Sequence, residues 1–75
     1  MTDELLKNID VELINIRIKF NDLRNNAYDE FKIAKTDDDK NNIMNYIRNT
    51  FVIESNIEDD INKLKDIVWR INHTL

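Results

Sequence analysis

The sequence contains no glycine, no proline and no cysteine in 75 residues. Average usage predicts roughly nine glycines and prolines together. A β-sandwich, a β-barrel or a Rossmann unit needs residues that adopt positive φ or pre-set tight turns, and this chain has only Asn and Asp for that purpose. The missing cysteines exclude disulfide frameworks, thiolate zinc sites and cysteine nucleophiles. The sequence therefore predicts an all-α fold.

Apolar residues recur at alternating spacings of three and four in both halves of the chain, which is the pattern of a heptad seam. In the first half only Glu30 interrupts it, and the positions are Leu6, Ile9, Leu13, Ile16, Phe20, Leu23, Ala27, Glu30 and Ala34. In the second half Thr50 and Glu54 interrupt it, and the positions are Ile43, Ile47, Thr50, Glu54, Ile57, Ile61, Leu64, Val68, Ile71 and Leu75. We therefore expect two long amphipathic helices.

The two expected helices meet at a polar stretch in the middle of the sequence. Thr36 and the run Asp37-Asp38-Asp39 provide a capping oxygen and first-turn carboxylates that suit the start of a helix. We predict one domain over residues 1–75, with a helix at 3–35, a turn at 36–37 and a helix at 38–74. Because the connection is short, the helices fold back on one another as an antiparallel helical hairpin.

Apolar residues also lie outside the seam, and a helix with apolar residues on two faces is normally buried on two faces. We therefore expect two hairpins to associate as a homodimer with the architecture of a four-helix bundle. We also expect the protein to bind a protein partner. Trp69 has polar helical neighbours in Asp66, Asn62 and His73, so it fits an interface residue. The residues predicted for self-association or partner binding are Val11, Ile14, Ile18, Tyr46, Phe51, Ile53 and Trp69.

An alternative architecture breaks the second helix near residue 54. The stretch from Asn49 to Ile53 contains weak helix formers. Ser55 and Glu58 have the spacing of a capping box, which is typical of the start of a new helix. The alternative is a three-helix bundle. In the continuous reading, residues whose numbers sum to about 74 lie opposite one another, which places Glu54 beside Phe20 as an internal polar residue between Arg17 and Arg24.

The chain lacks the residues that most enzymatic sites need. His73 is the only histidine and lies near the carboxyl end, and no Glu-x-x-His pair is present. Asp37, Asp39 and Asn41 match part of a calcium loop, but Asn42 stands where that loop needs glycine. We expect no enzyme, no cofactor and no metal.

The chain is acidic, with a formal net charge of −4, which disfavours nucleic acid as a partner. It has no membrane-length apolar run and no basic leader at its amino end, so no membrane partner and a cytoplasmic location are expected. Twelve Asn and twelve Ile indicate an AT-rich genome, as in a virus or phage. We predict a small interaction module that acts as an inhibitor, regulator or assembly subunit.

Two alternative functions stay open. The expected architecture resembles that of small bacterial RNA-binding hairpins of the Rop kind, and this resemblance implies RNA binding, although here Lys7, Arg17, Lys19 and Arg24 are interleaved with acidic residues. A second alternative is a small all-α enzyme with an arginine-lined site, as in the helical chorismate mutases. Its residues are Arg17, Arg24, Arg48 and Glu54.

Overall fold

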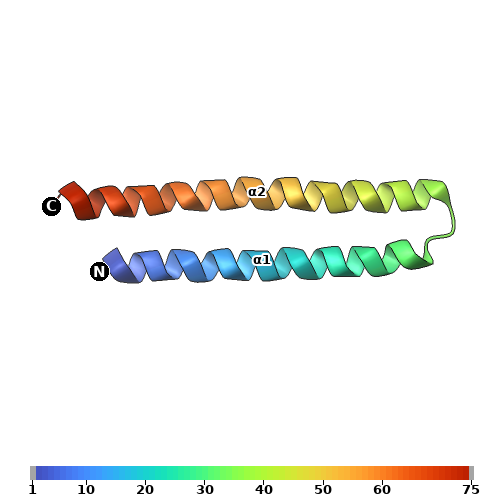
Figure 1. Cartoon of the computed structure of the whole chain (residues 1–75), viewed down its shortest axis with the longest axis horizontal. Coiled ribbons are helices and arrows are strands. Elements are labelled where there is room, and N and C mark those ends of the chain that lie inside the picture. Colours follow the sequence, from blue (N-terminus) through green and yellow to red (C-terminus); the bar gives the residue numbers. More distant parts are fainter. Residues whose placement is uncertain (1, 75) are drawn as a thin grey trace.

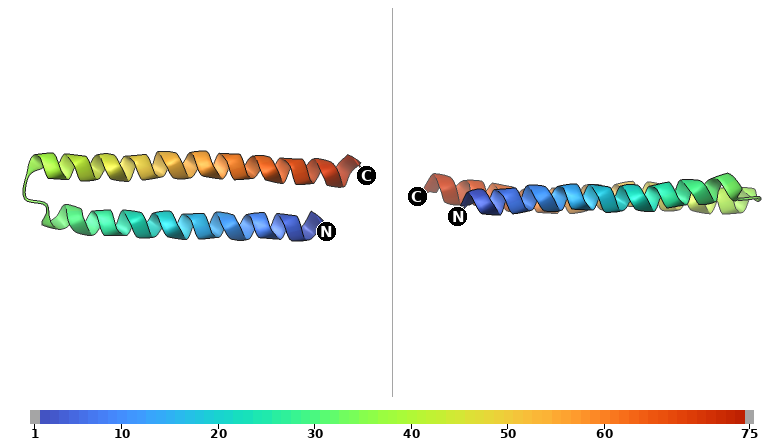
Figure 2. Two further views of the ribbon diagram at one scale, coloured as in Figure 1. Left: turned by 180° about the vertical axis from the view of Figure 1, so that it is seen from behind. Right: turned by 90° about the horizontal axis from the view of Figure 1, so that it is seen from below.

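A computed structural model describes residues 2–74 and shows two helices, α1 (Thr2–Ile33) and α2 (Asp37–Thr74), which lie side by side and run in opposite directions (Figure 1). The Cα atoms extend over 60 × 15 × 7 Å. Seen from the edge, one helix covers the other, so the molecule is a ribbon one helix thick (Figure 2). The predicted all-α antiparallel hairpin is confirmed.

The chain reverses direction over residues 34–36, so α1 ends two residues before the predicted end at 35. The Ala34 N–H donates to the carbonyl oxygens of Glu30 at 3.0 Å and Phe31 at 3.3 Å. Such a shared bond is common where a helix ends. Within residues 2–74 no residue has positive φ, so this reversal needs no glycine.

The start of α2 at Asp37, one residue before the predicted start at 38, is set by Thr36. The Thr36 Oγ1 accepts a hydrogen bond from the Asp39 N–H at 3.1 Å, and the Thr36 carbonyl accepts one from the Lys40 N–H at 3.1 Å. These are the bonds of an N-cap residue, whose own backbone is not helical. The capping role therefore keeps Thr36 outside both helices.

Helix α2 is continuous through residues 49–56, so the alternative three-helix bundle is wrong. The Thr50 hydroxyl donates to the Ile47 carbonyl at 2.6 Å, which satisfies this weak helix former within the helix. Glu58, the expected capping-box carboxylate, instead accepts a hydrogen bond from Arg17 on α1. Contacts with α1 therefore hold α2 together where its local sequence favours a break.

The helices are paired in nearly the expected register. The pairs Arg17 with Glu58 and Asp10 with Lys65 have residue numbers that add to 75, and Arg24 with Glu54 adds to 78, against the expected 74. In this register Glu54 is paired with Arg24, and Arg17 is paired with Glu58.

The buried core is a single row of side chains along the line where the helices touch. Its hydrophobic members in the described part are Leu13, Ala27, Ile47 and Val68. Two predicted seam residues, Leu23 and Leu64, are 43% and 51% exposed. Since two cylinders touch along a line, the hairpin covers only part of each heptad stripe.

Candidate functional site

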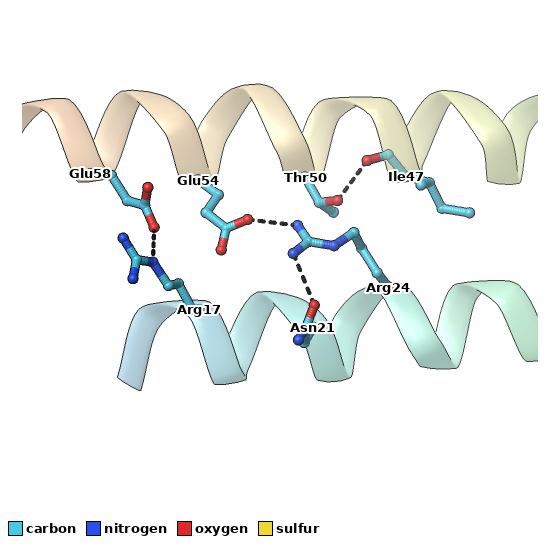
Figure 3. Close-up of polar contacts among 7 residues, drawn as sticks. All are labelled: Arg17, Asn21, Arg24, Ile47, Thr50, Glu54 and Glu58. Carbon is cyan, nitrogen blue, oxygen red and sulfur yellow. Dashed lines mark hydrogen bonds and ion pairs between the residues drawn. The ribbon is translucent and has the colours of Figure 1, made fainter. Parts of the chain in front are cut away.

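Arg24 and Glu54 form a polar contact inside the hairpin. Arg24 Nη1 lies 2.9 Å from Glu54 Oε1, and the two residues are only 6% and 9% exposed. Arg24 Nη2 donates to Asn21 Oδ1 at 3.2 Å (Figure 3). The Phe51 ring lies over the guanidinium, with 4.1 Å between Arg24 Cζ and the ring centroid. Because Arg24 Nη1 is buried and its contact with Glu54 does not meet hydrogen-bond geometry, charge attraction dominates this pair.

Arg17 does not join that pair. Its Nε donates to Glu58 Oε1 at 2.7 Å, with 60% of the Arg17 side chain exposed (Figure 3). The hydrogen bond to Glu58, followed by the Glu58 charge, raises the pKa of Arg17 above its ordinary value. The expected group of Arg17, Arg24 and Glu54 is therefore divided into two pairs, and each arginine is engaged by a carboxylate.

The Arg17–Glu58 pair lies on one face of the ribbon, and the buried Arg24–Glu54 pair lies between the helices next to it. A third pair, Lys65 with Asp10 at 2.7 Å, continues the row toward the free ends of the helices. A shallow groove beside it is lined by residues that include Ile14 and Asn62. We call this surface the ion-pair face, and its residues are Asp10, Ile14, Arg17, Arg24, Phe51, Glu58, Asn62 and Lys65.

The opposite face is lined mainly by apolar side chains, together with a smaller polar set, Asn8, Glu12, Asn26, Glu30 and Asn42. On α1, Leu13 faces α2, with Ile9 and Ile16 on one side of it and Asp10 and Arg17 on the other, as a helix of 3.6 residues per turn requires. Two grooves run along the side of Ile9 and Ile16, one near the free ends and one near the turn. We call this surface the apolar face, and its residues are Leu5, Ile9, Ile16, Leu23, Ile43, Tyr46, Ile53, Leu64 and Ile67.

The seven residues predicted for association are all exposed, but the structure does not bring them together. Tyr46 and Ile53 lie on the apolar face, since each precedes a buried residue of α2 by one position. Phe51 lies with Arg24 on the ion-pair face, and so does Ile14. The remaining apolar residues of α1 in this set, Val11 and Ile18, are on its outer edge, away from α2.

Trp69 stands on the ion-pair side of α2 and is 58% exposed. Its ring stacks on that of His73, with centroids 3.8 Å apart and planes 18° from parallel. His73 Nδ1 also lies 2.8 Å from the Trp69 carbonyl oxygen. The sequence places these residues four apart, on the same side of a helix, so the stack was within reach of sequence reasoning.

Within residues 2–74, no group of three or more His, Cys, Asp or Glu side chains is placed to hold a metal ion. Neither helix, over the same residues, has an apolar stretch of the length that crossing a membrane requires. No protein-family model, curated protein or solved structure matches this chain.

Proposed function

We propose that this protein is a small acidic interaction module that associates with itself and with a protein partner, and so acts as an inhibitor, regulator or assembly subunit in the cytoplasm. One observation carries the proposal. Fifteen large hydrophobic residues of the described part are more than 40% exposed, whereas four hydrophobic residues are buried. Exposed apolar surface of this extent on a soluble protein is typical of a protein-binding surface.

The elongated shape supports the same proposal. A ribbon one helix thick encloses no second layer, while stable domains pack two layers of secondary structure around a core. A chain of 75 residues buries too little surface to be more than marginally stable alone. Binding another protein supplies the missing layer, so binding and folding stability are linked.

The proposed function is tested by site-specific photo-crosslinking in the cells that produce the protein. A photo-reactive residue replaces Ile67 on the apolar face, Trp69 on the ion-pair side or Ser55 as an exposed polar control. We expect polypeptide adducts from Ile67, Trp69 or both, and few from Ser55. If no position yields a polypeptide adduct while the variants remain helical, the protein is not an interaction module.

A further inference from the structure

The apolar face is broad enough for a complete protein interface. The ribbon measures 60 Å by 15 Å between its Cα limits, so the projected footprint of either face is about 900 Å². A standard stable interface buries about 800 Å² on each partner. A docked segment of one helix would leave about half of this face uncovered, whereas a second two-helix ribbon would cover it along its full length.

We infer that the occupant of the apolar face is a second copy of this chain, and that the two hairpins pack apolar face to apolar face as a four-helix bundle. This inference rests on the proposed function and names the partner of one of its surfaces. In this arrangement Leu64, Ile67 and Ile53 enter a shared core, and the ion-pair face of each copy remains outside. The interface is isologous, so both copies contribute the same residues.

The distribution of charge permits a second copy on this face. The chain carries a net charge of −4, and two such chains repel one another unless the excess charge lies away from the contact. Asp37, Asp38 and Asp39 are at the turn end of the ribbon. With 3.6 residues per turn, Asp59 and Asp66 lie about 120° and about 100° around α2 from the buried Ile47, in the direction away from Ile53. Most of the excess charge is thus remote from the apolar face.

The flanks of the apolar face carry charges of both signs. Glu12 lines the groove near the free ends, and Lys19 follows it by seven residues and so lies on the same side of α1. On α2, Asp60 is beside Lys63 at 3.1 Å. Mixed charge at the rim with an apolar centre is the anatomy of a protein–protein interface, and it offers no basic surface for nucleic acid.

The test is sedimentation velocity of the purified full-length chain over a range of concentrations. We expect a species of twice the 9.0 kDa chain mass. Ile67→Lys should raise the dimer dissociation constant by about 100-fold or more, because each dimer loses two buried isoleucines. Ile18→Lys is the matched control, since Ile18 and Ile67 are 54% and 51% exposed in the single hairpin, and it should leave the dissociation constant within about threefold.

A second measurement covers the case in which Ile67→Lys fails to fold. The chain has no cysteine, so a single Cys at Ile67 or at Ile18 accepts one label. At concentrations where the dimer forms, a thiol-reactive label should modify the Cys at position 67 far more slowly than the Cys at position 18, because only position 67 is covered by the second copy. Equal labelling rates, or equal weakening by the two lysine variants, overturns the assignment of the apolar face.

The outcomes separate this inference from the proposed function. A chain that stays at 9.0 kDa at about 100 µM overturns the second copy as occupant. If Ile67 still crosslinks to a different polypeptide in cells, the proposed interaction function survives that result. If neither association nor crosslinking occurs, both proposals fail.

Discussion

The two faces of the hairpin satisfy their side chains in different ways. On the ion-pair face, Arg17, Arg24 and Lys65 each meet a carboxylate of the other helix within 2.9 Å, so these charges are paired within the hairpin, although Ile14 and Phe51 on that face are 54% and 51% exposed. On the apolar face, Tyr46 and Ile67 are 46% and 51% exposed. The first face therefore holds α1 to α2 through paired charges, while the second presents exposed apolar side chains, which we propose are covered by another protein.

The strongest test of the ion-pair face is Glu54→Ala. Removing this carboxylate leaves Arg24 as a buried, uncompensated charge, so we expect the free energy of unfolding to fall by about 3 to 5 kcal/mol. The measurement is urea unfolding followed by circular dichroism at one fixed protein concentration.

The control for Glu54→Ala replaces both partners. Arg24→Met combined with Glu54→Leu removes both charges and keeps the volume, so the double variant should be as stable as the natural chain or more stable. A single variant that costs less than about 1 kcal/mol would show that the pair is solvated and does not fix the register of the helices.

The apolar face is tested by Ile53→Ala against Ile18→Ala. Both side chains are half exposed in one hairpin, at 51% and 54%. If the apolar face is covered, Ile53→Ala creates a cavity and costs about 2 kcal/mol or more, whereas Ile18→Ala stays within about 0.5 kcal/mol. Thermal unfolding at matched concentration compares them, and equal losses would remove the distinction between the apolar face and the outer edge.

The turn joins the two helices, and its capping residue Thr36 stabilises the start of α2. Thr36→Ala removes the hydroxyl that accepts from the Asp39 N–H, and we expect a loss of about 1 kcal/mol. Thr36→Ser keeps the oxygen and should retain most of that stability. The same urea titration measures both variants, and a cost for the serine variant equal to that of alanine would mean that the hydroxyl does not cap α2.

The smallest effect is expected at Arg17. The Arg17 side chain is 60% exposed, so Arg17→Gln should lower the free energy of unfolding by less than Thr36→Ala does. The loss caused by Arg17→Gln should become smaller in about 1 M salt, because salt screens the ion pair. Because the folded pKa of Arg17 is raised, the contribution of its ion pair is present below the unfolded pKa of Arg17 wherever Glu58 is ionised, and it is lost as the pH rises through the folded pKa. Urea midpoints at low and high salt measure the effect, and a large salt-independent loss would contradict it.

Sequence periodicity predicts the fold well because the spacing of apolar residues indicates which side of each helix is apolar, and this does not depend on the other helix. The heptad spacing gives the hairpin, and Thr36 with the following aspartates gives the position of the turn within two residues. The continuity of α2 is less accessible, because Thr50 and Ser55 favour a local break that contacts with α1 overcome. Local propensity is a weak guide wherever a partner helix supplies the stabilising contacts.

Sequence reasoning is less successful with the surfaces. It identifies exposed apolar residues such as Val11 and Trp69 but not the face to which each belongs, because that depends on which part of the stripe α2 covers. The alternative with a break near residue 54 also assigns Glu58 to a capping box, whereas α2 is continuous there and Glu58 accepts a hydrogen bond from Arg17. A side chain that is one heptad position away from another can lie beside the helix contact or on the outer edge of the helix instead of at the contact itself.

The most direct test of a covered apolar face is a methyl NMR spectrum recorded while the protein is diluted from millimolar to low micromolar concentration. We predict concentration-dependent shifts for the methyl groups of Ile53, Leu64 and Ile67, with those of Val11 and Ile18 unchanged. Shifts confined to Val11 and Ile18, or no shift at any methyl group, would contradict the account.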